Sequence, residues 1–132
     1  MIKAFVDTSA WYGLICKDDP AHAMIKRVLK AWESRLVTTN YVLDETLTLV
    51  RARLGHVLAV KAGETLRNPD VVDLSRVTPE DEENAWSLFV KYKDQDFSYT
   101  DCTSFSVMRR LGLETVLSTD HHFQQAGFHR EP

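Results

Sequence analysis

The fold is decided by the N-terminal stretch Ile2-Lys3-Ala4-Phe5-Val6-Asp7-Thr8-Ser9. Its first five residues form a short, mainly apolar run, which predicts a buried strand. Asp7, Thr8 and Ser9 carry side chains that cap helix N-termini, and a helical pattern over 10–16 follows at once. A strand that passes directly into a helix is typical of the βα units from which parallel sheets are built.

Segments with strand and helix patterns alternate along the rest of the chain. Further strands are predicted at 36–38, 71–74, 114–118 and, at an edge, 127–129. Helices are predicted at 21–35, from Asn40 to Gly55, onward to Arg67, and at 79–93 and 99–111. We therefore expect an α/β fold with one parallel sheet of about five strands, covered by helices on both faces through right-handed crossovers.

Length and composition indicate one ordinary globular domain. The 132 residues match the size of a single core, so we expect one domain over residues 1–132. No apolar run approaches the roughly 20 residues of a membrane span. The start of the chain lacks the pattern of a signal sequence, so we expect a cytoplasmic protein without a membrane segment. Two cysteines are too few for a disulfide scaffold or a structural zinc site.

The net charge of −3 is unevenly distributed. Nine basic and six acidic residues lie between Lys17 and Arg67, whereas three basic and nine acidic residues lie between Asn68 and Asp101. The acidic run 80–83 follows Thr78 and Pro79, which have the pattern of an N-cap and a first helical residue. We interpret this run as a solvated face that complements the helix dipole.

Four acids stand where a parallel sheet would bring them together. Ligands of such sheets bind at the carboxyl ends of the strands, near the point where the strand order reverses. Asp7 follows the first predicted strand, and Asp120 follows the strand that ends near Ser118. Asp101 lies in the first turn of the helix that starts near Ser98, and Glu45 lies in the second turn of the helix that Asn40 caps.

Each acid also has an ordinary structural explanation, as a cap, a turn residue or a solvated helix residue. Together they pose an electrostatic problem, because carboxylates about 7 Å apart repel by roughly 2 kcal/mol per pair at an effective dielectric constant of about 20. A divalent cation offsets that repulsion. Oxygen ligands without a thiolate favour Mg²⁺ or Mn²⁺ over zinc.

Four stretches carry a resemblance to a known family. They are Phe5-Val6-Asp7-Thr8-Ser9, Val42-Leu43-Asp44-Glu45-Thr46, Ser98-Tyr99-Thr100-Asp101-Cys102-Thr103-Ser104-Phe105 and Leu117-Ser118-Thr119-Asp120-His121-His122-Phe123. In this order the chain resembles the PIN-domain ribonucleases, specifically the VapC toxins of bacterial and archaeal toxin–antitoxin pairs. The resemblance implies a single PIN domain whose four acids, Asp7, Glu45, Asp101 and Asp120, hold Mg²⁺ or Mn²⁺.

Some details of this site stay open at the level of sequence. Helical periodicity does not decide whether Asp44 or Glu45 turns inward, although the resemblance favours Glu45. Hydroxyls that would support the ligands are offered by Thr8, Ser9, Ser118 and Thr119. His121 and His122 follow Asp120, but adjacent residues rarely both reach one ion, which disfavours a zinc site.

The resemblance implies a metal-dependent endoribonuclease in which water attacks the phosphodiester bond. It also implies a VapB-like antitoxin, which would lay a basic side chain among the acids and cover an apolar groove along the helices between Ala10 and Trp32, and it implies a homodimer. Residues that could face the RNA are Arg51, Arg53, Lys61, Arg109, Arg110, Trp11 and Tyr99.

Other classes of function fit the sequence less well. A response-regulator receiver needs paired acids after its first strand, and a phosphatase of the Asp-x-Asp kind needs an acid where this chain has Ser9. Two alternatives within the same fold remain. One is a PIN nuclease of RNA processing that is not a toxin, and the other is a catalytically silent PIN module that binds RNA or protein.

Overall fold

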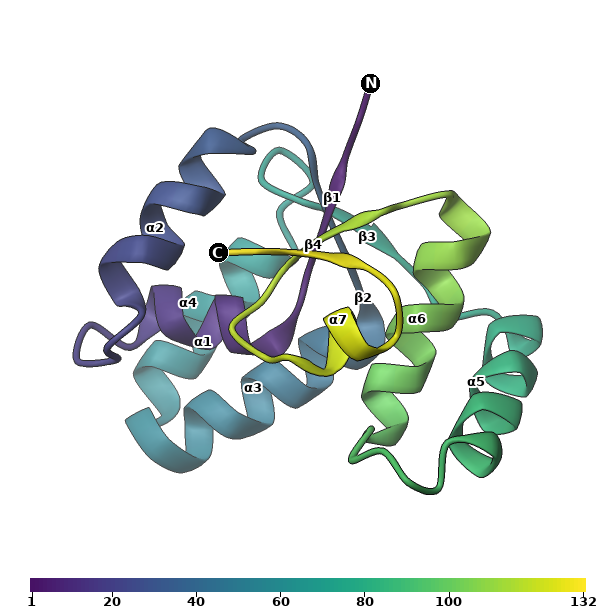
Figure 1. The fold of residues 1–132 in the computed structure, drawn as a ribbon. Helices are drawn as coiled ribbons and strands as arrows, with labels where there is room; N and C mark the ends of the chain where they lie inside the picture. The colour runs from purple at the N-terminus through teal and green to yellow at the C-terminus, as the bar shows by residue number, and fades with distance from the viewer.

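The structure, a computed structural model, describes residues 1–132 and contains one five-stranded parallel sheet with the strand order β3-β2-β1-β4-β5 (Figure 1). The strands are β1 (Ala4–Val6), β2 (Leu36–Thr39), β3 (Asp73–Ser75), β4 (Thr115–Leu117) and β5 (His129–Glu131). β1 lies in the centre and pairs with β2 on one side and β4 on the other. Its residues Ala4, Phe5 and Val6 are fully buried, as the N-terminal apolar run predicts.

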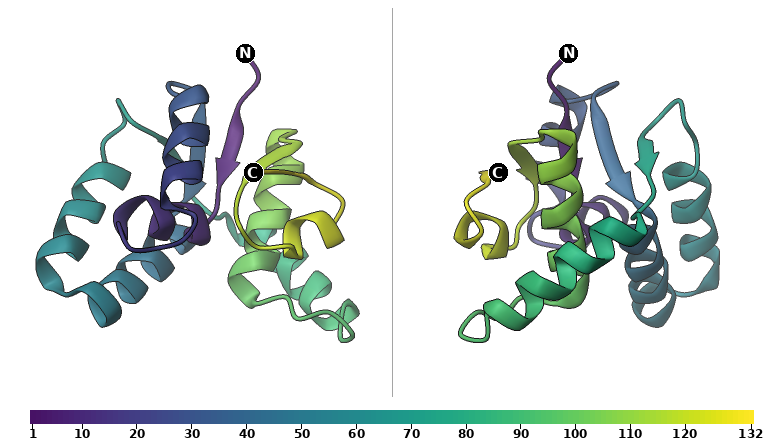
Figure 2. Two further views of the ribbon diagram at one scale, coloured as in Figure 1. Left: turned by 60° about the vertical axis from the view of Figure 1, so that its left-hand side comes forward. Right: turned by 90° about the vertical axis from the view of Figure 1, so that its right-hand side faces the viewer.

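Seven helices cover the two faces of the sheet. They are α1 (Thr8–Ile15), α2 (His22–Ala31), α3 (Asn40–Leu54), α4 (His56–Leu66), α5 (Pro79–Lys91), α6 (Tyr99–Leu111) and α7 (His122–Gln125). The left-hand view of Figure 2 shows α1 to α4 on one side of the strands and α5 to α7 on the other. This arrangement confirms the predicted α/β architecture. None of the helices is both long and apolar enough to cross a membrane.

The strand order explains why the helices divide in this way. From β1 to β3 the chain moves steadily outward in one direction, and it then returns past β1 to form β4 and β5. Right-handed crossovers in opposite directions place their helices on opposite faces. The order therefore reverses between β1 and β4, and the crevice for a ligand is expected at the carboxyl ends of these two strands.

Several predicted boundaries were wrong because turns shorten or shift the elements. The third strand begins at Asp73 instead of residue 71, since the backbone N–H groups of Val71 and Val72 bond to the Asn68 carbonyl in a turn. The last strand covers His129–Glu131 instead of 127–129, and Gly127 takes a positive φ of 98° before it. The helix α7 was not predicted; it is four residues long.

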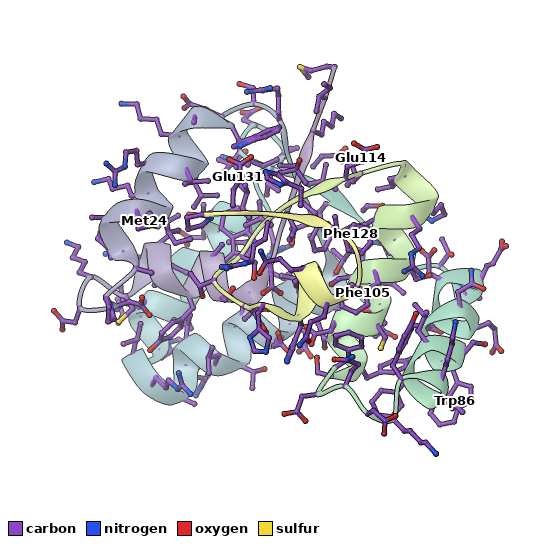
Figure 3. The ribbon with its side chains drawn as sticks, in the orientation of Figure 1. Met24, Trp86, Phe105, Glu114, Phe128 and Glu131 are labelled. Atoms are coloured by element: carbon purple, nitrogen blue, oxygen red, sulfur yellow. The ribbon has the colours of Figure 1, made fainter.

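Aromatic rings fill the side of the core beneath α6 and α7. Phe105 packs edge-on against Phe97 and Phe123, with ring centroids 5.0 Å and 5.1 Å away. It also stacks on Phe128, which leads into β5, at 5.8 Å; Figure 3 labels both rings. These contacts fix α6 and the short α7 against the sheet. Residues 101–108 of α6 are buried without interruption, so this helix is a rigid internal element.

An ion pair between a buried carboxylate on α5 and a partly exposed arginine on α6 joins the two helices. Asp81 has 1% of its surface exposed, belongs to the capping box with Thr78, and accepts two hydrogen bonds from Arg110 Nε and one from Nη2 at 2.9–3.1 Å. Burial alone would raise the pKa of Asp81, but the hydrogen bonds from Arg110 and the Thr78 backbone outweigh it and hold the pKa below its usual value. One acid of the run 80–83 is therefore structural and not solvated, contrary to our interpretation.

Breaking this pair from the Arg110 side should destabilise the fold. Arg110→Met leaves a buried carboxylate without its partner, and we expect a loss of about 2 kcal/mol in the free energy of unfolding, measured with urea. Asp81→Asn, which can still accept the Thr78 hydrogen bond, should lose less. Lys3→Met serves as the control, because Lys3 forms an exposed pair with Asp73, and it should change the free energy by about 0.5 kcal/mol or less. Equal losses in all three variants would contradict the role given to the buried pair.

Candidate functional site

Asp7 lies at the end of β1, where the strand order reverses. It is the N-cap of α1, and its Oδ2 accepts hydrogen bonds from the Ser9 backbone N–H at 3.4 Å and the Ser9 hydroxyl at 3.0 Å. The Ser118 hydroxyl, which follows β4, donates to the same oxygen at 3.0 Å. The other oxygen, Oδ1, receives no hydrogen bond from the protein. Oδ2 of this buried carboxylate is therefore held in place by the protein, whereas Oδ1 is available to a ligand.

A small hydroxyl network continues from Asp7 to Asp120. The Oγ atoms of Ser9 and Ser118 are 3.0 Å apart, and Ser118 Oγ accepts from the Asp120 backbone N–H at 2.9 Å. Ser118 therefore links the ends of β1 and β4. The hydroxyls of Thr8 and Thr119, which were also predicted to support the ligands, do not belong to this network. Thr119 contributes only its backbone N–H, which bonds to Ser9 Oγ, and Thr8 Oγ1 is buried without a hydrogen-bond partner.

Asp101 enters the crevice from the first turn of α6. With Ser98 it forms a reciprocal capping box, in which Asp101 Oδ2 accepts from the Ser98 backbone N–H at 3.0 Å. The same carboxylate can therefore cap the helix and serve as a site residue. Oδ2 is used for the cap, whereas Oδ1 is free of protein hydrogen bonds, as in Asp7.

The structure adds His122 to the site, which the sequence argument had set aside together with His121. His122 Nδ1 lies 2.9 Å from Asp101 Oδ2 and 3.1 Å from Asp120 Oδ2. Asp101, Asp120 and His122 each offer one atom to a cluster within 4.8 Å that could hold a metal ion. The two histidines differ because α7 begins here. The side chain of His122 is 16% exposed and that of His121 is 69% exposed.

Glu45 lies in the second turn of α3 and is half-buried, whereas the neighbouring Asp44 is exposed. The helix thus turns Glu45 further inward than Asp44. Glu45 makes no hydrogen bond or ion pair with the protein, and it lies outside the cluster of Asp101, Asp120 and His122. The structure brings Asp7, Asp101 and Asp120 into one network and leaves Glu45 as a free carboxylate.

The carboxylates of Asp7, Asp101 and Asp120 crowd negative charge into the crevice. Burial raises the pKa of Asp7 from 3.8 to about 7, and the nearby charge of Asp101 adds to the shift. Burial also raises the pKa of Asp101. No lysine or arginine forms an ion pair with any of the four predicted acids. Such a group of oxygen donors suits a hard divalent cation, which neutralises the charge and restores the ionised forms.

The residues predicted to face RNA are only partly suited to that role. Trp11 is 1% exposed and its Nε1 donates to Thr38 Oγ1, so it belongs to the core and is not available to stack on a base. Arg110 is engaged by Asp81. Arg51 and Lys61 are exposed, and Arg53 lies over the Tyr12 ring, 5.5 Å from its centroid.

Comparison with known proteins shows the family to which the chain belongs. The model of the PIN domain family matches residues 4–129. The 23S rRNA-specific endonuclease VapC20 of Mycobacterium tuberculosis is 40% identical over 124 residues, which are 94% of each chain. The VapC ribonuclease of Archaeoglobus fulgidus is 30% identical over 127 residues, covering 92% of this chain and 80% of the relative.

Solved structures give the same result. The crystal structure of M. tuberculosis VapC20, described as a sarcin–ricin loop cleaving toxin, superposes with a TM-score of 0.91 and 38% identity over 96% of both chains. The DNA-bound VapBC complex of Salmonella typhimurium shares the fold, with a TM-score of 0.72 and 16% identity over 99% of this chain and 98% of its counterpart. The chain belongs to the PIN-domain family and, within it, to the VapC ribonucleases.

Proposed function

We propose that this protein is a toxin of the VapC type, a metal-dependent endoribonuclease in which Asp7, Glu45, Asp101 and Asp120 hold Mg²⁺ or Mn²⁺. One observation carries the proposal. Asp7 and Asp101 are buried carboxylates that each have one oxygen fixed by hydrogen bonds and the other left free, and neither forms an ion pair with a lysine or an arginine. Such carboxylates are costly to ionise unless something else supplies positive charge.

The residues of the crevice fit a hard cation. Their free donors are carboxylate oxygens, and neither cysteine of the chain belongs to the cluster. A divalent cation held there would lower the pKa of a water molecule bound to it and would withdraw negative charge from the phosphate. Ser9 and Ser118 hold Asp7 in position, and the capping box holds Asp101, so both carboxylates are oriented before any ligand arrives. With water as the proposed nucleophile and the 3′-oxygen as the leaving group, a new P–O bond forms to water and the P–O3′ bond breaks, so the products carry a 5′-phosphate and a 3′-hydroxyl.

We propose an rRNA loop as the substrate and the cytoplasm as the place of action. The relative that is 40% identical is named for specificity toward 23S rRNA, and its crystal structure is described as that of a toxin that cleaves the sarcin–ricin loop. Because the chain matches that toxin over nearly its whole length, the sarcin–ricin loop of 23S rRNA is the first substrate to test. Arg51, Arg53 and Lys61 offer exposed positive charge for its phosphates.

We propose a VapB-like antitoxin as the partner. An apolar pocket of about 240 Å³ lies between α1 and α4, lined mainly by Trp11, Leu14, Ile15, Leu58, Ala62 and Leu66. The groove expected from the sequence lay along α1 and α2. The pocket in the structure also borders α1, but its other wall is α4 and not α2. An arginine from the antitoxin would satisfy the free carboxylates of the crevice with charge-assisted hydrogen bonds and so exclude both cation and phosphate.

We also propose that the protein forms a homodimer. The helix α5 exposes Trp86, Phe89 and Val90 on one side, with 56%, 42% and 58% of their surfaces accessible. Figure 3 shows Trp86 pointing away from the sheet. An exposed apolar ridge of this kind supports self-association.

Neutralising the acids one at a time tests the catalytic proposal. Asp7→Asn, Glu45→Gln, Asp101→Asn and Asp120→Asn should each lower the rate of RNA cleavage by about 100-fold or more, because each removes a charged ligand. Their melting temperatures should stay equal or rise as repulsion is relieved. Asp44→Asn is the matched control, because Asp44 is adjacent to Glu45 but exposed, and its cleavage rate should stay within about twofold of that of the unaltered chain.

Removal of divalent cations tests the same proposal. EDTA should stop RNA cleavage, and Mg²⁺ or Mn²⁺ should restore it. Cleavage that persists in excess EDTA would overturn the mechanism.

The stability of the metal-free protein should fall as pH rises from about 4 to about 7. In this range folded Asp7 keeps a proton that the unfolded chain has lost, because its folded pKa is about 7. The slope for this one group is at most about 1.4 kcal/mol per pH unit, and the raised pKa of Asp101 adds in the same direction. Urea unfolding in EDTA from about pH 5 to about pH 8 measures the slope. Asp7→Asn should flatten it, whereas an identical slope in that variant would show that Asp7 is already ionised.

Expression of the chain alone should arrest bacterial growth, and the Asp101→Asn variant should not. Co-expression with the small gene encoded beside it should relieve the arrest, and its product should co-purify. Primer extension on 23S rRNA from arrested cells should stop within the sarcin–ricin loop. If the unaltered chain is harmless and no small partner co-purifies, a nuclease of RNA processing becomes the better account. If it also fails to cut RNA in vitro, the silent binding module does.

A further inference from the structure

The side chain of His122 lies between two acids that come from different parts of the fold. Asp101 belongs to the first turn of α6, and Asp120 belongs to the loop after β4. His122 Nδ1 hydrogen-bonds to Asp101 Oδ2 at 2.9 Å and lies 3.1 Å from Asp120 Oδ2. The His122 backbone N–H donates to the remaining oxygen of Asp120 at 3.0 Å. One residue therefore contacts both carboxylates.

We propose that His122 is a positioning residue that sets the spacing of Asp101 and Asp120 for a divalent cation, an inference that rests on the proposed function. The distances assign Nδ1 the role of donor. A nitrogen lone pair facing two carboxylate oxygens at about 3 Å would be repelled, whereas an N–H at the same place is attracted to both. A protonated Nδ1 cannot be a ligand. It leaves Asp101 Oδ1 free for the cation.

The ring of His122 is held from behind by the aromatic core. It packs edge-on against Phe97, with centroids 5.6 Å apart, and Phe97 in turn packs against Phe105 of α6. The next residue, Phe123, is fully buried beside Phe5 of β1. The imidazole is thus fixed relative to both α6 and the sheet, so it can hold the two acids at one separation.

This position matters because the two acids repel each other. The charge of Asp120 contributes to raising the pKa of Asp101, and His122 acts in the opposite direction. Without the imidazole, the loop that carries Asp120 loses its contact with α6 and a cation has to draw the two carboxylates together when it binds. A ligand pair that is already in place binds more tightly than one that must be ordered on binding.

The test is the affinity of the purified full chain for Mn²⁺, Mg²⁺ and Ni²⁺, measured by titration calorimetry in the absence of RNA. His122→Ala should raise the Kd for all three ions by about 10-fold. His122→Asn can place an amide N–H near the position of Nδ1 and should recover binding to within about threefold of the unaltered chain. His121→Ala is the matched control and should stay within about twofold. Melting temperatures of the metal-free variants check that each one folds.

The possible outcomes separate the role of His122 from the proposed function. If His122→Ala binds Mn²⁺ as tightly as the unaltered chain while Asp101→Asn does not bind it, the positioning role is overturned and the metal site stands. If both His122 variants lose Ni²⁺ affinity far more than Mn²⁺ affinity, the imidazole is a direct ligand, because nitrogen donors favour Ni²⁺, and the positioning role is again overturned. If the unaltered chain binds none of the ions, the metal site itself fails and the role of His122 fails with it.

Discussion

Repulsion among carboxylates held together in a buried crevice is the constraint on which the rest of this structure depends. Asp7 and Asp101 are almost entirely removed from water, and this burial raises the pKa of both. The charge of Asp101 raises the pKa of Asp7 further, and the charge of Asp120 acts in the same direction on Asp101. A fold that only had to be stable would replace them by neutral residues. The chain instead surrounds them with hydrogen-bond donors that fix one oxygen of each and leave the other free, which is the arrangement that a cation requires.

The elements of the fold serve to hold these acids in register. Asp7 is placed by the central strand, because β1 ends at the point where the strand order reverses. Asp101 is placed by α6, whose uninterrupted burial over 101–108 and packing through Phe105 prevent it from shifting. The carboxylates gain further rigidity because both take part in helix capping, Asp7 as the N-cap of α1 and Asp101 in the capping box with Ser98. Each of these side chains therefore has a structural role in helix capping and a proposed functional role in the site.

The opposite solution is found in α5, where the buried carboxylate of Asp81 is neutralised within the protein by Arg110. No lysine or arginine forms an ion pair with the crevice acids, whose basic neighbours are histidines. The chain thus contains both kinds of buried acid. The difference between them, a permanently charged arginine beside Asp81 and no lysine or arginine beside the crevice acids, distinguishes a structural charge from one that is kept for a ligand.

The sequence by itself determined the α/β class, the parallel sheet and the positions of the acids at strand ends and helix starts. These features follow from local patterns: apolar runs, caps such as Ser98, and the rule that parallel strands share one ligand-binding edge. The tertiary structure alone decided which side chains meet. Whether Ser118 or Thr119 supports Asp7 depends on where β4 ends, and which of two adjacent histidines reaches the acids depends on a four-residue helix without a sequence signal of its own. Contacts such as that between His122 and Asp101 join residues far apart in the chain, so only the packing of α6 and α7 against the sheet creates them.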